Sequence, residues 1–249
     1  MDILKTLNRR KFIAAAGMMA AALPLGAAAF DFEPSAGEAF NFVLLGDLHF
    51  DKLEHHDPAY LKARYPNDIG QIENYSRISR ENLPLLLKEA KRKGRALEAD
   101  FYLQLGDFVE GLCGSQALAQ QQTTEFISLV ADQNFNRPFF VIKGNHDITG
   151  EGAPETFKTT VLSWQSKEHK KRLPSANTTF VHKNVRFVLF DCFTPEESLE
   201  WLKMVLANHK EELLFFCVHY PIVPFNSRSN WTVFAKAHEQ NQREELLNL

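Results

Sequence analysis

Short apolar runs that end in a polar residue recur along the chain. Residues 41–47 read NFVLLGD, residues 100–107 read DFYLQLGD and residues 138–145 read PFFVIKGN. A continuous apolar run of this length, closed by a turn residue, is typical of a buried strand. The run ELLFFCVH over residues 212–219 has the same character and ends with a histidine. The pattern therefore predicts four buried strands, each followed closely by a polar side chain.

Apolar residues recur at helical spacing over residues 79–97 and around residues 116–133. This spacing predicts two helices, and Pro84 fits the first only near its start. A third helix is expected after Thr194, because Thr-Pro-Glu-Glu has the form of a capping box with proline at the first helical position. Residues 178–191 read as a hairpin that turns at a Lys-Asn pair. Strands alternating with helices favour an α/β fold with a parallel or mixed sheet covered on both faces.

The first 29 residues differ in kind from the rest. A basic start precedes an apolar stretch rich in Ala and Met that ends in three alanines, which is the layout of a signal peptide over residues 1–29. Residues 8–13, NRRKFI, resemble a twin-arginine signal. We therefore expect the twin-arginine export machinery as a partner and a periplasmic or secreted protein. An uncleaved anchor is the alternative, but the stretch is barely long enough to span a membrane, so no stable membrane anchor is expected.

Residues 30–40 read as a linker, and one sizeable α/β domain follows. The chain of 249 residues is 45% hydrophobic and 24% charged, which fits a globular protein. Its formal net charge of -3 gives no signature of polyanion binding, so nucleic acid is not an expected partner. Three cysteines do not make a disulfide framework.

The polar residues behind the predicted strands are of types that bind metals. In open α/β sheets, ligands bind beyond the carboxyl ends of the strands, and glycines there allow the tight turns. Carboxylate, amide oxygen and imidazole ligands together suit Mn, Fe or Zn, and no thiolate is offered. The residues expected at this shared edge are Asp47, His49, Asp107, Asn145 and His219.

Four motifs carry a resemblance to a known family. GDLH (46–49), GDFVE (106–110), GNHD (144–147) and VHYP (218–221) resemble the motifs of the calcineurin-like metallophosphoesterase superfamily. The resemblance covers essentially the whole mature chain, so residues 41–249 are taken as one metallophosphoesterase domain. It implies an α/β fold of the four-layer α/β/β/α sandwich type, with mixed sheets and two divalent metal ions.

The resemblance also implies a role for each ligand. Asp47 and His49 would bind the first ion, and Asp107 would bridge both. Asn145 and His219 would bind the second ion. Two such ions, about 3.5–4 Å apart, clamp a phosphoryl group and generate hydroxide at neutral pH.

His146 is implied to face the substrate in this family. It would protonate the leaving oxygen or stabilise the charge that develops, with Asp147 orienting its ring. The alternative for His146 is a loop histidine with a purely structural hydrogen bond.

Two features depart from the family pattern. Glu110 stands where relatives often have Asp, Asn or Tyr; the absence of Tyr, together with His49, argues against a purple acid phosphatase. Relatives also close the metal site with a late Gly-His-x-His, which this sequence lacks, and His238 reads as part of a polar helix face. We therefore expect a domain that is incomplete at its C-terminus, binds at least one ion weakly and is nearly inactive. Closure of the site by other residues, His238 first among them, is the alternative.

Residues 49–57, HFDKLEHHD, follow the first two ligands directly. They are either a substrate-facing loop that acts through His55, His56 or Asp57, or a solvated loop.

The function expected from these motifs is hydrolysis of a phosphomonoester or phosphodiester in a small phosphorylated substrate, by metal-activated hydroxide with help from His146. A non-catalytic relative that binds metal or ligand is the alternative. A nuclease shares the same motifs, but expected export and the lack of a basic stripe count against it. Substrate choice depends on loops whose shape a sequence does not show.

Overall fold

The computed structural model describes residues 39–223 and 232–249. The predicted signal peptide over residues 1–29 and nearly all of the predicted linker lie outside the described residues. Among the described helices, none is both long enough and apolar enough to cross a membrane.

The first sheet is parallel and has the order β1-β2-β3. Its strands are β1 (Phe42–Leu45), β2 (Phe101–Gln104) and β3 (Phe139–Val141). Strands β2 and β3 are fully buried, as predicted. The prediction of a fully buried β1 is wrong, because β1 lies at the edge of this sheet and Leu44 is 37% exposed.

The second sheet is mixed and has the order β4-β5-β6. Strands β4 (Thr178–His182) and β5 (Val185–Leu189) form the predicted antiparallel hairpin, and β6 (Leu213–Cys217) pairs with β5 in parallel. Lys183, in the turn, has a φ of 53°, the left-handed conformation that such a tight turn requires. Mixed pairing is therefore confirmed for this sheet, whereas the first sheet is parallel throughout its described strands.

The predicted helices are present with corrected bounds. The helix predicted over residues 79–97 is two helices, because one ends at Glu81 and the next begins at Leu83, with Pro84 in its first turn. The helix after Thr194 begins at Pro195 as predicted, but Thr194 makes no capping hydrogen bond; its hydroxyl lies 2.9 Å from that of Ser198 instead. The described helices are η2 (Leu53–His55), α1 (Pro58–Arg64), α2 (Ile69–Glu81), α3 (Leu83–Ala96), α4 (Gln116–Gln133), η3 (His146–Ile148), α5 (Ala153–Thr156), η4 (Phe157–Val161), α6 (Leu162–Glu168), α7 (Pro195–Asn208), η5 (Ala237–Glu239) and α8 (Gln240–Asn248).

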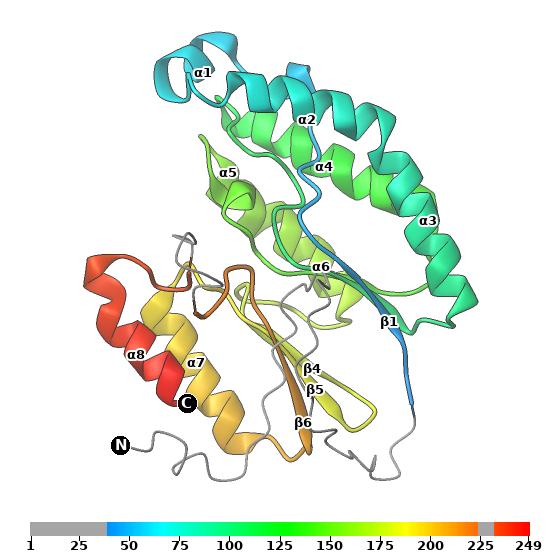
Figure 1. Cartoon of the computed structure of the whole chain (residues 1–249), viewed down its shortest axis with the longest axis vertical. Coiled ribbons are helices and arrows are strands. Elements are labelled where there is room, and N and C mark those ends of the chain that lie inside the picture. The colour runs from blue at the N-terminus through cyan, green and yellow to red at the C-terminus, as the bar shows by residue number, and fades with distance from the viewer. Residues whose placement is uncertain (1–38, 224–231) are drawn as a thin grey trace, which may run out of the picture.

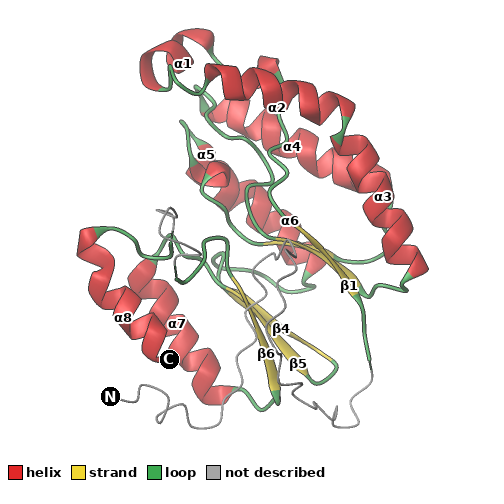
Figure 2. Cartoon of the chain, viewed as in Figure 1, coloured by secondary structure: helices red, strands yellow, loops and turns green. Residues whose placement is uncertain are grey.

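The elements stack in four layers, as predicted. Helices α2, α3, α4 and α6 lie on one side of the molecule and α7 and α8 on the other, with the two sheets between them (Figures 1 and 2). Alternate side chains of the strands explain the layers. On β2, Tyr102 packs toward the helices together with Leu87 of α3 and Phe126 of α4. Its neighbour Phe101 packs toward the second sheet, where its ring lies 5.1 Å from that of Phe187.

The outer face of the second sheet is covered in the same way. Val188 of β5 and Phe216 of β6 pack with Leu199 and Leu202 of α7 and Leu246 of α8. Each fully buried side chain of this size stabilises the fold by about 1.5–3 kcal/mol. The two outer cores and the core between the sheets therefore hold the strand ends in fixed positions.

Two further predictions are confirmed. The three cysteines form no disulfide framework, since all are free, and all are buried. His238, in η5, has a side chain that is 77% exposed, as expected for a polar helix face.

Candidate metal centre

The predicted ligands come together from both sheets rather than from one sheet edge. Asp107 follows β2 and Asn145 follows β3, whereas His219 follows β6 of the second sheet. The carboxyl ends of these strands meet, and the backbone N–H of His49 donates to the carbonyl of Asp107 at 3.0 Å. The tight approach requires a glycine at position 144, because a Cβ there would lie 2.1 Å from the backbone nitrogen of Asp107.

Gln104 is a positioning residue that no sequence motif marks. It is the last residue of β2 and is fully buried. Its amide oxygen accepts the N–H of Gly106 at 2.9 Å, and its amide nitrogen donates to the carbonyl of Gly46 at 3.1 Å. One side chain thus satisfies the backbone of two loops, those before Asp47 and Asp107.

Three potential ligand atoms converge at His219, one of which is its own Nε2. Its Nε2 lies 3.1 Å from Oδ1 of Asn145 and 3.3 Å from Oδ2 of Asp107. Its Nδ1 lies 2.8 Å from the carbonyl of Leu105, which can only accept, so Nδ1 carries a proton. In the neutral ring Nε2 then has a lone pair, and the three atoms can all bind one cation.

The electrostatics of His219 agree with this arrangement. Burial lowers its pKa, but the hydrogen bond and the charge of Asp107 outweigh burial and raise the pKa to about 9. Burial raises the pKa of Asp107, but the hydrogen bond to His219, the charges of His219 and His146 and the hydrogen bond from the backbone of His146 together outweigh burial and lower it. The site therefore favours a positive charge at this position, which a divalent ion supplies.

The other ligand group consists of Asp47, His49 and Asp107, whose ligand atoms all lie within 4.8 Å of one another. Nε2 of His49 is 3.8 Å from Oδ2 of Asp107. Asp107 thus belongs to both groups, which is the geometry that a bridging carboxylate requires. With Asn145 and His219, the donor set is carboxylate, imidazole and amide oxygen, which fits two hard or borderline divalent ions.

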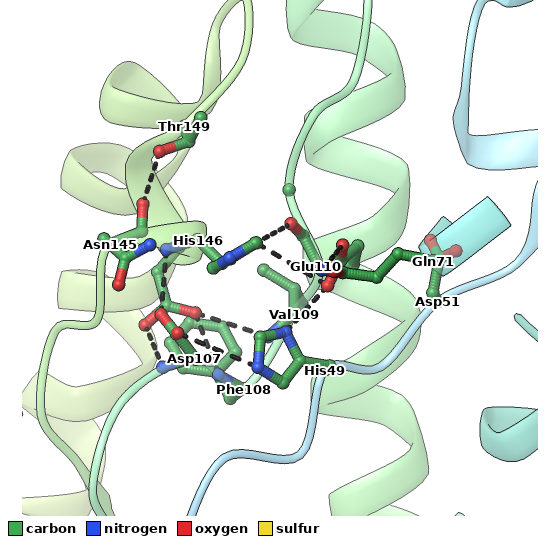
Figure 3. A network of polar contacts seen from close by, with 12 residues as sticks. His49, Asp51, Gln71, Asp107, Phe108, Val109, Glu110, Asn145, His146 and Thr149 are labelled. Carbon is green, nitrogen blue, oxygen red and sulfur yellow. Dashed lines mark hydrogen bonds and ion pairs between the residues drawn. The ribbon is translucent and has the colours of Figure 1, made fainter. Parts of the chain in front are cut away.

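Glu110 has a structural role that its sequence motif did not reveal. It is fully buried, and its Oε2 accepts the Nδ1 proton of His49 at 2.7 Å (Figure 3). Its Oε1 accepts from Nε2 of Gln71 at 3.1 Å, and its backbone carbonyl accepts from Nδ1 of His146 at 2.7 Å. A proton held on Nδ1 of His49 leaves Nε2 free for a metal, as in other carboxylate–histidine–metal arrangements. The sequence signal for this role was the position of Glu110 in the GDFVE motif.

The same contacts decide how a second cluster is interpreted. His49, Glu110 and His146 also bring potential ligand atoms within 4.8 Å of one another. However, the two imidazole Nδ1 atoms each donate to Glu110, one to its carboxylate and one to its carbonyl. We therefore assign this cluster to hydrogen bonding, not to a third ion.

The prediction that Asp147 orients His146 is wrong. Asp147 is buried, and its carboxylate accepts the N–H groups of Asp107 at 3.0 Å, of Gly144 at 2.7 Å and of the two residues after Asp107. It therefore ties the loop after β2 to the loop after β3. The ring of His146 is held instead by the carbonyl of Glu110 and packs edge-on against His49, with ring centroids 4.7 Å apart.

Neither predicted role of His55 and His56 is correct, because both are buried and do not form a substrate-facing or a solvated loop. Nε2 of His56 donates to Oδ1 of Asp51 at 2.8 Å, and Nε2 of His55 lies 3.1 Å from the carboxylate of Glu125. Asp57 is exposed and caps the N-terminus of α1. These residues stabilise the fold behind the metal centre.

Comparison with known proteins identifies the family. The family model of the calcineurin-like phosphoesterases matches residues 40–244, so the chain belongs to this family. It is accordingly a metal-dependent phosphoesterase, a hydrolase that acts on phosphoric esters. A crystal structure of a dimetal phosphatase from Danio rerio is similar at a TM-score of 0.49 and 18% identity, over 84% of this chain and 76% of that one. No curated protein matches the chain.

Proposed function

We propose that this phosphoesterase binds two divalent ions through Asp47, His49, Asp107, Asn145 and His219 and hydrolyses a small phosphomonoester or phosphodiester. The observation that carries the proposal is the convergence of ligand atoms of His219, Asn145 and Asp107. With its raised pKa, the ring of His219 donates an Nε2 proton toward these oxygens, and a divalent cation can replace that proton and bind all three atoms.

The bound ions would polarise the phosphoryl group and supply hydroxide at neutral pH. The chain's own residues then set the geometry. The carboxylate of Glu110 keeps the proton of His49 on Nδ1, and the backbone carbonyl of Leu105 keeps the proton of His219 on Nδ1. Both imidazoles therefore present Nε2 toward Asp107.

His146 is proposed to assist the leaving group. Its Nδ1 donates to the carbonyl of Glu110 and keeps that proton throughout. Nε2 has no assigned partner among the described residues, so the imidazolium form can give its Nε2 proton to the leaving oxygen. The fixed Nδ1 hydrogen bond determines which nitrogen acts.

The test is hydrolysis of p-nitrophenyl phosphate and bis(p-nitrophenyl) phosphate by protein that has been stripped with a chelator and reloaded with Mn²⁺, Fe²⁺ or Zn²⁺. Because this sequence lacks the late Gly-His-x-His, we expect activity that is low, depends on added metal and is lost in Asp107→Asn. Asp132→Asn, an exposed carboxylate on α4, is the matched control and should keep activity. Metal binding without turnover of either ester would favour a non-catalytic role instead.

We also propose that the leader over residues 1–29 directs export, so that the enzyme acts in the periplasm or outside the cell. The arginine pair at positions 9 and 10 supports this part of the proposal. Exchange of both arginines for lysine should move the activity from the exported fraction to the cytoplasmic one. Unchanged fractionation would contradict twin-arginine export.

A further inference from the structure

Lys143 and Asp191 form an ion pair that joins the two sheets at the end that carries the metal centre. Lys143 follows β3 and stands two residues before Asn145, whereas Asp191 stands two residues after β5. Nζ of Lys143 contacts Oδ2 of Asp191, and the two side chains are 11% and 3% exposed. The pair therefore crosses from the first sheet to the second in a region where little water competes.

The surroundings of the pair restrain both partners. Nζ of Lys143 lies 5.6 Å from the ring centre of Phe157 and 5.8 Å from that of Phe193, distances at which a cation is attracted to an aromatic face. Oδ1 of Asp191 accepts the N–H of Phe193 at 2.9 Å. The ring of Phe193 in turn lies 6.3 Å from the ring of His219.

These contacts connect the two segments that supply ligands to one metal ion, the loop after β3 and the end of β6. The loop after β3 carries Asn145, and Phe193 packs beside His219 at the end of β6. The core between the sheets is made of apolar side chains, such as Phe101, Phe187 and Cys217. Apolar contacts are non-directional, so they do not by themselves determine how far one sheet slides past the other. A buried ion pair is directional, so it determines the position of one sheet relative to the other at this end.

A second pair joins the sheets at the opposite end. Nε2 of His182, the last residue of β4, lies 3.0 Å from Oδ2 of Asp100, which precedes β2. Asp100 thus stands at the start of β2, the far end from Asp107. This pair contributes to the contact between the sheets without touching the metal centre.

We propose that Lys143 and Asp191 are positioning residues that hold Asn145 against His219 and thereby set the affinity for the ion bound between them. The inference rests on the proposed two-ion function. Partners outside the ligand set change metal affinity by about 10–100-fold when they are removed.

The experiment measures Mn²⁺ binding to the chelator-stripped chain of 249 residues by isothermal titration calorimetry. The double variant Lys143→Met/Asp191→Leu removes the pair without leaving a lone buried charge. One of the two ions should bind at least about 10-fold more weakly, and the other should change by less than about threefold. Lys143→Arg keeps the ion pair and should therefore bind both ions with the wild-type affinity.

A cycle with Asn145→Ala identifies which ion is affected. Because the pair acts through Asn145, combining the two changes should weaken binding by less than the product of their separate effects. The matched control is Asp100→Leu/His182→Met, which removes the far pair and should leave both affinities unchanged. If Lys143→Met/Asp191→Leu does not fold, Asp191→Asn replaces it, with the same loss expected for the same ion.

Equal binding in the wild type and the pair variant would overturn the inference, and so would an equal loss in the Asp100–His182 control. Fully multiplicative effects with Asn145→Ala would also overturn it. Failure of the proposed function looks different: wild-type protein that binds two ions but hydrolyses no phosphoester would refute the hydrolase, while the binding measurements would still decide the role of the pair.

Discussion

Glu110→Gln tests the central feature of the metal centre, the hydrogen bond that fixes the ring of His49. The change keeps the size of a fully buried side chain and removes its charge. In the wild-type protein the carboxylate faces two donors, Nδ1 of His49 at 2.7 Å and Nε2 of Gln71 at 3.1 Å. A glutamine amide offers one oxygen and one NH₂ group in place of two acceptors.

Either orientation of the new amide weakens the ion held by His49. If the oxygen faces His49, a charge-assisted hydrogen bond becomes a neutral one, at a cost of about 1–1.5 kcal/mol. If the NH₂ group faces His49, the proton of the ring must move to Nε2, which blocks the metal-binding lone pair. We therefore expect a 10–100-fold loss of affinity for this ion, equivalent to about 1.4–2.7 kcal/mol.

Calorimetric titration of the stripped protein with Mn²⁺ measures this loss directly. The affinity of the ion beside Asn145 and His219 should change little, so the two binding steps should separate. Gln71→Ala is the control, because it removes a contact to Glu110 from an exposed side chain and leaves His49 in place; its effect should stay below about threefold. Wild-type affinities for both ions in Glu110→Gln would refute the assignment of Glu110.

Four further changes have defined outcomes. Asp107→Asn should lower activity more than any other single ligand change, since it serves both ions; normal metal content and turnover would show that it is not a bridge. His146→Ala should spare metal content but lower kcat by about 10²–10⁴-fold, most for poor leaving groups, and an equal loss for all leaving groups would indicate substrate positioning. Gly144→Ala should lower both thermal stability and metal content, because its Cβ would lie 2.1 Å from the backbone of Asp107; an unchanged melting temperature would contradict this close approach. Hydrogen bonds from Arg186 lower the pKa of Glu211 from 4.5 to about 2, so its stabilising effect is present above about pH 4.5 and is lost as the pH falls toward 2. Glu211→Gln should therefore unfold about 1 kcal/mol more easily than wild type at pH 7, with the difference vanishing near pH 2 in denaturant titrations.

Local sequence patterns predicted the elements well where one principle governs the segment. The apolar run over β2 and the helical spacing over α4 gave the observed elements, and the turn residues between β4 and β5 gave the hairpin. The two errors differ in cause. The exposure of Leu44 is tertiary, because it depends on the position of β1 at the sheet edge. The break at Asn82 between α2 and α3 is local, because Pro84 fits a helix only in its first turn.

The candidate ligands were also predictable, because strand ends and turn chemistry are properties of a few neighbouring residues. The sequence determined that carboxylate, imidazole and amide groups follow four strands. What they contact was decided only by the tertiary structure: His219 arrives from the second sheet, and His49 meets Glu110 from 61 positions away. Asp147 and His56 show the same limit, since each finds its partners on loops brought near by packing. Hydrogen-bond partners depend on distances across the folded chain, and no pattern along a strand or a turn encodes those distances.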